Sequence, residues 1–348
     1  MNNDQPIIAV THDGLFHSDE VMACALLRLA AGSSHVAIIR SRLAKDWERA
    51  DFVLDVGNQY DGVKWFDHHQ AGFNEKREDG TGYSCFGLLW KSIGITMLRE
   101  LLLPYKMEDV MIAEVADDME NFVKGIDLHD QSQLNVNARW SLNKSIYAEI
   151  LTLQTMVSSL NPVPFIDKSD TITSNQQFYI ALDFAVTLLK RMVFRKASKV
   201  IAKKYVATRI KPDQNVLYLE EYCDWYETVS SHKHILYVVY PSSNGRAFVV
   251  QAVKGNSGAS TVNNLKLPFP AQWGGLSDES LVKISGEPTA LFCHRDRFIA
   301  SASTLVGAYS LAQKSIILQP NESAKYSIQT RCETTGTTVV DPGQQASR

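Results

Sequence analysis

An α/β protein of more than one domain is predicted by three features of the sequence. Apolar runs typical of buried strands alternate with helical segments over residues 6–127, which is the pattern of a parallel sheet with helices on its faces. A long helical stretch follows, and after it come strand-like runs separated by turn residues. The chain has 348 residues, which is too long for one ordinary hydrophobic core.

The N-terminal part is expected to alternate strands and helices. Apolar runs that end in polar residues predict strands within residues 6–14, 35–41, 51–57 and 63–69. A helix is expected between the first two strands, because Ser18 can act as its N-cap, acids follow in the first turn and Gly32 can end it. Helical spacing also predicts helices over residues 43–50, 85–102 and 107–127.

These elements divide the chain into four parts. We expect an N-terminal α/β domain over residues 1–146 and a helical connector over residues 147–212. A smaller C-terminal α/β domain is expected over residues 213–320, built partly on a β-meander. Residues 321–348 are rich in Thr, Gly, Gln and Ser and are expected to form a flexible tail.

Composition and charge restrict the class of protein. The net charge is −3, so contact with nucleic acid would have to come from a local basic patch. The five cysteines are widely spaced and form no C-x-x-C pair, which indicates reduced thiols of an intracellular protein rather than disulfides or a zinc site. No apolar stretch is long enough to cross a bilayer, and no leader is recognised at the N-terminus. A cytoplasmic protein without membrane contact is therefore expected.

Histidines and aspartates are concentrated where predicted strands and helices end. Because the carboxyl ends of parallel strands meet at one edge of a sheet, these side chains are expected to lie together. Imidazole and carboxylate without cysteine favour manganese or a similar ion over structural zinc. More than four candidate ligands indicate two ions, which can share a hydroxide and clamp the oxygens of a phosphoryl transfer. The residues are His12, His17, Asp19, Asp55, His68, His69, Asp127 and Asp130.

The triplet Asp67-His68-His69 has distinct roles in such a site. Asp55, at a strand end, is well placed to bridge two ions. His68 can bind an ion while His69 points towards the substrate, and Asp67 can hold an imidazole in its correct tautomer. Taken singly, each of these residues is more often an ordinary loop or turn residue. Their occurrence together favours a metal site.

Several stretches of the sequence resemble a known family. The chain has THDGLFHSDEVMACALLR near its start, then LDVG, then DHHQ after a strand. These resemble the DHH phosphoesterase superfamily and, within it, the melanocyte-proliferating-gene-one exonuclease family, whose members typically open with T-H-x-G-x-F-H-x-D-E and carry D-H-H-Q. The likeness continues through ENFVKGIDLHDQ, LNPVP, LPFPAQWGGLSDESL and FCHRDRFIASAS.

The resemblance implies a parallel-sheet DHH-type phosphoesterase domain, a helical connector and a smaller C-terminal α/β domain. Two Mn²⁺ ions are implied as cofactors, with Mg²⁺ or Co²⁺ as further candidates. Asp55 would bridge the ions, and His69 would contact the scissile phosphate or assist the leaving group, with Asp67 beside it. The family is associated with metal-dependent 3′-to-5′ cleavage of RNA. The implied metal ligands are His12, His17, Asp19, Asp55, His68 and Asp127.

The sequence departs from the family pattern at three places. Residues 130–132 read D-Q-S where members usually have D-N-G, which makes Asp127 the preferred ligand. Residues 298–301 read F-I-A-S where F-I-G-G is common, so two glycines that would let a backbone approach a phosphate are missing. Lys266 stands where an arginine is common, which replaces a bidentate fork by a point charge. The hydrolytic core is expected to be intact, with a shift in substrate preference.

Basic residues elsewhere are candidates for holding the substrate. Within residues 188–205, four of them recur every four positions and therefore share one helix face. That face is either a surface for a nucleic-acid backbone or an ordinary solvated face. A histidine at a strand end of the second domain is a further candidate. The full set is Arg191, Arg195, Lys199, Lys203, Lys266 and His294.

The sequence therefore predicts a divalent-metal-dependent phosphodiesterase, and most specifically a 3′-to-5′ exonuclease on RNA or single-stranded DNA. A small-molecule phosphoesterase acting on dinucleotides or pyrophosphate is one alternative. A non-catalytic nucleotide-binding protein is the other, and the full set of candidate ligands argues against it. The expected partner is RNA, another nucleic acid or a nucleotide. A homo-oligomer is compatible with the sequence.

Overall fold

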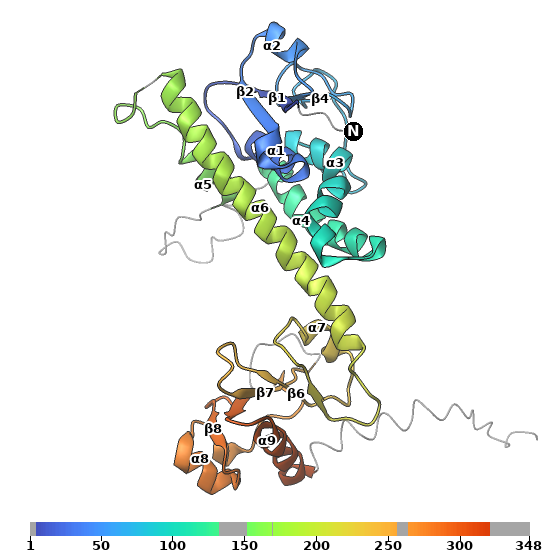
Figure 1. Ribbon diagram of the computed structural model, residues 1–348, viewed down its shortest axis with the longest axis vertical. Coiled ribbons are helices and arrows are strands. Elements are labelled where there is room, and N and C mark those ends of the chain that lie inside the picture. Colours follow the sequence, from blue (N-terminus) through green and yellow to red (C-terminus); the bar gives the residue numbers. More distant parts are fainter. Residues whose placement is uncertain (1–4, 132–151, 169, 256–263, 321–348) are drawn as a thin grey trace, which may run out of the picture. The chain divides into compact units, whose positions relative to one another are not determined.

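The structure is a computed structural model of the chain, and it describes residues 5–131, 152–168, 170–255 and 264–320 (Figure 1). Contacts between residues divide the chain into two compact units, Met1–Val200 and Ile201–Arg348. The predicted tail and the boundary predicted at residue 147 lie outside the described residues. The boundary predicted at residue 213 stays a prediction.

Four parallel strands form the sheet of the first unit, in the order β2-β1-β3-β4. In the register of the central strand, Ile7 pairs with Val36 on one side and Ala9 with Phe52 on the other. All strands run in the same direction, so their carboxyl ends form one edge of the sheet, as predicted. The strands are β1 (Ile7–Thr11), β2 (Val36–Arg40), β3 (Phe52–Leu54) and β4 (Trp65–Phe66).

Helices bury the apolar side chains of this sheet. The helix α1 (Ser18–Ala31) contacts the sheet as well as α3 (Cys85–Leu102) and α4 (Asp109–Asp130). Positions 18–27 of α1 are therefore all buried, in agreement with the apolar character of most of that segment. The N-cap of α1 is His17 rather than the predicted Ser18, so Ser18 is the first helical residue.

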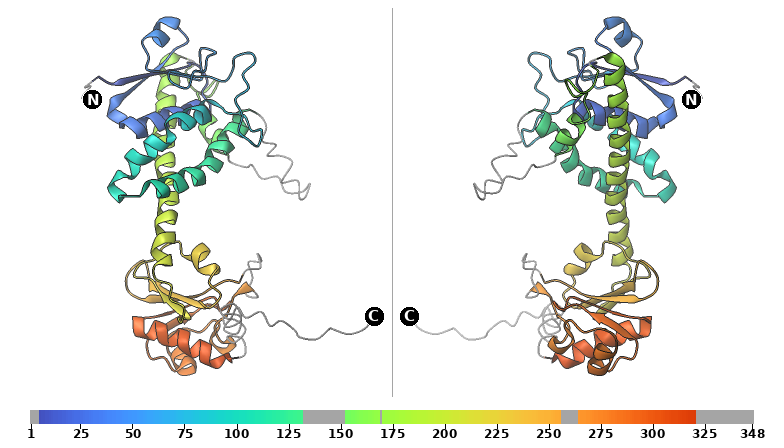
Figure 2. Two further views of the ribbon diagram at one scale, coloured as in Figure 1. Left: turned by 90° about the vertical axis from the view of Figure 1, so that its right-hand side faces the viewer. Right: turned by 90° about the vertical axis from the view of Figure 1, so that its left-hand side faces the viewer.

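Part of the predicted connector belongs to the core of the first unit. The helix α6 (Thr171–Ala207) carries apolar residues at steps of three and four, from Phe178 through Leu182 to Val200, and these pack into the first core. Figure 2 shows α6 passing beside the other helices of this unit. The preceding helix α5 (Leu153–Ser158) also contributes, through Val157.

The second unit has a five-stranded mixed sheet in the order β5-β6-β7-β9-β8. Its first two strands are parallel, and the remaining pairs are antiparallel, so the predicted meander begins only at β6. The α/β class is thereby confirmed for both units. The strands are β5 (Val216–Tyr218), β6 (Tyr237–Pro241), β7 (Phe248–Ala252), β8 (Ala290–Cys293) and β9 (Ile299–Ala302), and the helices are α7 (Tyr226–Ser230), α8 (Asp278–Ser285) and α9 (Leu305–Leu318).

Short elements complete the two units. They are the helix α2 (Ala44–Glu48) and the 3₁₀ helices Ser33–His35, Leu103–Tyr105 and Ala271–Trp273. Among the described residues, no helix combines the length and the apolar character needed to cross a membrane. The four described cysteines carry free thiols, as predicted.

Candidate active site

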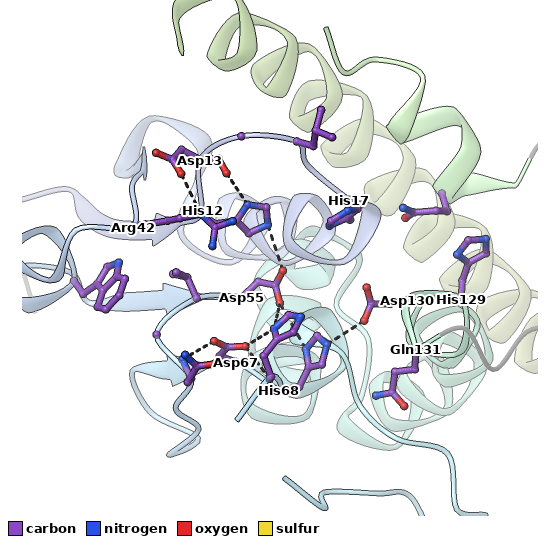
Figure 3. A pocket seen from close by; sticks show the side chains of 18 residues that line it. His12, Asp13, His17, Arg42, Asp55, Asp67, His68, His129, Asp130 and Gln131 are labelled. Atoms are coloured by element: carbon purple, nitrogen blue, oxygen red, sulfur yellow. Dashed lines mark hydrogen bonds and ion pairs between the residues drawn. The ribbon is translucent and has the colours of Figure 1, made fainter. Parts of the chain in front are cut away.

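The carboxyl edge of the parallel sheet opens into a pocket of about 1230 Å³. His12 directly follows β1, Asp55 follows β3, and His68 and His69 come shortly after β4. Asp130, the last residue of α4, lines the same pocket. Figure 3 shows His12, His68 and Asp130 gathered around Asp55. The sheet edge therefore brings together residues from distant parts of the sequence, as parallel topology predicts.

A first group of possible metal ligands consists of His12, His17, Glu20 and Asp55. His12 Nε2 lies 3.2 Å from Glu20 Oε1 and 3.4 Å from Asp55 Oδ2. Its other ring nitrogen lies 3.0 Å from the Asp13 carbonyl oxygen, which orients the ring. Burial lowers the pKa of His12, but the contacts with Asp55 and Glu20 outweigh it and raise that pKa from 6.5 to about 10.

A second group consists of Asp19, His68 and Asp130. His68 Nε2 lies 3.1 Å from Asp130 Oδ2, and His68 Nδ1 lies 3.6 Å from Asp55 Oδ1. Asp55 thus faces both groups, one oxygen towards His12 and the other towards His68. It adopts a left-handed backbone with φ of 55°, a conformation that aspartate tolerates better than most residues.

The carboxylate oxygens and imidazole nitrogens of these groups are suited to bind a divalent cation. Five buried atoms of these two groups have no hydrogen-bond partner among the described residues: both carboxylate oxygens of Asp19, Glu20 Oε2, Asp55 Oδ1 and His68 Nδ1. Unsatisfied buried oxygens of this kind are costly. Burial, together with the charges of Asp55, Asp130 and Glu20, raises the pKa of Asp19 well above its ordinary range. Imidazole and carboxylate are also the ligand types that such ions take, so the groups are compatible with a divalent metal site.

A fourth histidine of the site, His69, is held by an aspartate. Asp67 is 1% exposed; its Oδ1 lies 2.8 Å from His69 Nδ1 and accepts the His69 backbone N–H. Its Oδ2 accepts the Asn58 backbone N–H. These contacts lower the pKa of Asp67 although burial raises it, and the contact with Asp67 raises the pKa of His69. His69 is itself largely exposed and lines the pocket.

Comparisons with known proteins assign the chain to a family. A model of the MYG1 exonuclease family, described as an uncharacterised protein family (UPF0160), matches residues 8–316. The chain belongs to this family. The MYG1 exonuclease of Homo sapiens is 31% identical over 330 residues, which cover 88% of this chain and 85% of the human protein. A MYG1 protein of Schizosaccharomyces pombe is 30% identical over 334 residues, which cover 92% of this chain and 100% of the yeast protein.

A solved structure also resembles the chain. It is a pGpG-specific phosphodiesterase from Vibrio cholerae, with 13% sequence identity, coverage of 91% of this chain and 99% of that chain, and a TM-score of 0.25. That score is too low to support an inference about fold or function. The membership of the MYG1 exonuclease family therefore rests on the family model and the eukaryotic relatives.

The structure places Asp127, a predicted ligand, outside the two groups described above and outside a third possible group among the described residues, which consists of Asp55, Asp67, His68 and His69. Its carboxylate accepts hydrogen bonds from the backbone N–H (3.1 Å) and hydroxyl (2.6 Å) of Ser84 and from the Gly87 N–H, and it pairs with Arg77 at 2.7 Å. Asp127 therefore caps the first turn of α3. A Cβ at position 87 would collide with this carboxylate, so the close approach requires glycine. Asp130 belongs to one of these groups, and metal binding by Asp127 stays a prediction.

Sequence reasoning missed two residues that shape the site. Glu20 lies in the first turn of α1, where an acid also has the ordinary role of complementing the helix dipole; its carboxylate accepts the His17 N–H at 2.7 Å and contacts His12. Arg40 ends β2, is buried, and donates to the carbonyls of His12 and Gly14. In the sequence, Arg40 could have been recognised as a candidate because it is a charged residue at the end of an apolar run.

The predicted substrate role of Lys266 does not fit its position. The side chain is 5% exposed, and its ammonium donates to the carbonyls of His232 at 2.8 Å and Ile235 at 3.2 Å. Burial lowers its pKa to about 8. Lys266 therefore holds the segment after α7 inside the second unit.

The remaining candidates for substrate contact lie outside the described pocket. His294 Nδ1 accepts the Asp296 N–H at 3.1 Å, within the turn that joins β8 to β9. Arg191 and Arg195 are exposed on the side of α6 opposite to its buried apolar residues. Lys199 and Lys203 follow on the same face. Their contact with substrate stays a prediction.

Proposed function

We propose that the chain is a divalent-metal-dependent phosphodiesterase that removes nucleotides from the 3′ end of RNA. The observation that carries the proposal is the pair of ligand groups that Asp55 faces with its two carboxylate oxygens, together with five buried atoms of these residues that lack hydrogen bonds. Membership of a family whose mammalian relatives are named MYG1 exonuclease supports a hydrolytic phosphoesterase.

His12, His17, Glu20 and Asp55 would hold one ion, and Asp19, Asp55, His68 and Asp130 would hold a second. Bound Mn²⁺ or a similar ion would supply Lewis acidity and lower the pKa of water. The protein contributes the rigid placement of the ligands. His12 is fixed by the Asp13 carbonyl, and the loop that carries it is fixed by Arg40.

His69 would act on the substrate itself. Asp67 occupies Nδ1 of this imidazole, which leaves Nε2 for a phosphate or leaving-group oxygen. Because the contact with Asp67 raises the pKa of His69, the ring holds its proton to higher pH than an ordinary histidine. A protonated imidazole can stabilise negative charge on phosphate oxygens or protonate a leaving oxygen.

Hydrolysis of a short 5′-labelled single-stranded RNA with added Mn²⁺ tests the proposal. Asp55→Ala removes the carboxylate that faces both groups, and Asp117→Ala is the control, because Asp117 is exposed on α4. We expect a ladder that shortens one nucleotide at a time for the parent protein and for Asp117→Ala, and intact RNA for Asp55→Ala. A ladder that persists in Asp55→Ala would refute the assigned site.

The same proteins separate the other two functions. Cleavage of dinucleotides or pyrophosphate with intact RNA would favour the small-molecule phosphoesterase. Binding of nucleotides without cleavage of any of these compounds would favour the non-catalytic protein. Measuring bound manganese in Asp55→Ala and Asp117→Ala adds a readout that does not depend on turnover, and equal metal content in both would contradict the proposed ligands.

A further inference from the structure

One flank of the pocket carries side chains that none of the ligand groups uses. Arg42, Trp47, Val56, Gly57 and Asn58 line it, and we call these five residues the Trp47 slot. Arg42 is the single lysine or arginine among the lining residues that the structure describes. In Figure 3, Arg42 and Asp13 lie on the opposite side of Asp55 from His129 and Gln131. The slot is therefore a separate surface next to the site of hydrolysis.

Trp47 is held in a fixed orientation. Its indole N–H donates to the Ser41 carbonyl at 3.2 Å, and its ring packs against Trp65 at a centroid distance of 6.2 Å and an angle of 84°. Both rings rest on the small apolar cluster that includes Val53 and Val56. The indole N–H of Trp47 thus already has a partner within the protein. The part of the ring that faces the pocket offers an apolar aromatic surface. Binding to a rigid surface of this kind costs little conformational entropy.

Gly57 makes this arrangement possible. It has φ of +97°, and a Cβ at this position would lie 2.6 Å from Trp65 Cζ3. Trp65 therefore lies directly against the backbone of Gly57, and Trp47 packs against Trp65 in turn. Gly57, the last residue of the LDVG stretch, thus sets the position of the Trp47 indole.

Two polar side chains accompany the aromatic surface. Arg42 is 61% exposed and pairs with Asp13 at 3.2 Å, which keeps its guanidinium at the rim of the pocket. Asn58 is exposed, and its backbone N–H is bonded to Asp67. A guanidinium is suited to phosphate oxygens, and a side-chain amide can pair with the edge of a base.

We propose that the Trp47 slot is a nucleobase subsite, in which a base stacks on Trp47 while Arg42 binds a phosphate of the same substrate. The proposal rests on the phosphoesterase assignment and specifies its substrate class. Pyrophosphate has no planar apolar part and would leave the indole unused, whereas a nucleotide uses both the ring and the guanidinium. The slot therefore favours nucleotide substrates over inorganic ones. Stacking also tolerates any base, as a nuclease that acts on successive nucleotides requires.

The test compares the affinities of AMP and ribose 5-phosphate for the full-length protein in the presence of Mn²⁺, measured by calorimetry. These probes differ chiefly in the base. We expect AMP to bind at least about tenfold more tightly, which lies within the contribution of base–aromatic stacking. Trp47→Leu should remove most of this difference, and Trp47→Phe should retain part of it. Arg42→Ala should weaken both probes by a similar factor.

Leu43→Ala is the matched control, because Leu43 is 56% exposed beside α2 and does not line the pocket. Equal affinity of the parent protein for AMP and ribose 5-phosphate would overturn the proposal, even if Trp47→Leu did not fold. An unchanged AMP preference in a folded Trp47→Leu would overturn it as well. RNA cleavage combined with either result would refute the slot and leave the phosphoesterase standing. A base preference that depends on Trp47, without any cleavage, would establish the slot and refute the proposed hydrolysis.

Discussion

The carboxylate of Asp130 lies 3.1 Å from Nε2 of His68, although the two residues come from a helix end and a strand end far apart in the sequence. Three positions earlier on the same helix, Asp127 faces away from this contact and caps α3. Two aspartates within one helical turn thus have separate tasks, one towards the pocket and one towards the helix packing. Substitution of each should therefore have a distinct effect.

If Asp130 binds the metal as proposed, Asp130→Asn should reduce turnover and metal affinity by about 100-fold or more, because removal of a direct ligand costs at least as much as removal of its supporting groups. Its free energy of unfolding should change by less than about 1 kcal/mol, since the side chain is partly exposed and the change affects chiefly its ion pair with His68. Asp127→Asn should instead cost about 2–4 kcal/mol, because it weakens a helix cap and leaves the partly buried Arg77 poorly paired. Denaturant unfolding and metal titration measure the two effects. Loss of metal in Asp127→Asn with normal stability would contradict this division.

Asp67→Asn should change the pH dependence of the reaction. The contact with Asp67 raises the pKa of His69, so activity that needs the protonated ring persists below that pKa and is lost as the pH rises through it. Removing the carboxylate charge should move this loss to lower pH and reduce turnover by about 10- to 100-fold. The profile of kcat/KM against pH measures the shift. In a His69→Ala background, Asp67→Asn should have almost no further effect, and a full additional loss would show that Asp67 acts independently of His69.

The site residues at the strand ends were predictable because their placement follows from the topology of the sheet alone. Alternating strands and helices indicated a parallel sheet, and a parallel sheet brings the residues after β1, β3 and β4 to one edge. His12, Asp55 and His68 follow directly from that argument. Their placement does not depend on how a helix is rotated or how a loop packs.

Which of Asp127 and Asp130 faces the pocket was not predictable in the same way. Both residues lie in the last turn of α4, and which one faces the pocket depends on how that helix packs against α3, with Gly87 admitting the Asp127 carboxylate. The buried position of Lys266 was hard to predict for a related reason. Lysine is so rarely buried that a lysine in a sequence is expected to lie on the surface. These features depend on close approach in three dimensions, which periodicity does not encode.

The exposed arginines of α6 provide a test of the predicted nucleic-acid surface. Reversing Arg191 and Arg195 to glutamate should weaken RNA binding and flatten its dependence on salt, by about 0.7 in the slope of log K against log salt for each phosphate that is no longer neutralised. Lys283→Glu is the control, because Lys283 is exposed on α8 and is not one of the predicted contacts. Titration of labelled RNA at several salt concentrations measures both quantities. Binding and slope equal to those of the parent protein would identify this face as an ordinary solvated surface.

Lys266 should make the stability of the protein depend on pH in a specific window. Burial lowers its pKa from 10.5 to about 8, so between these values the unfolded chain binds more protons than the folded one, and stability attributable to this residue rises with pH. Lys266→Met removes the titrating group while keeping an unbranched side chain, although it leaves the carbonyls of His232 and Ile235 without their donor. The variant should therefore be less stable at neutral pH by about 1–3 kcal/mol and should lack the rise between pH 8 and 10.5. Urea unfolding of the parent and variant across this range measures the difference, and a parallel pair of curves would show that Lys266 keeps its ordinary pKa in the folded state.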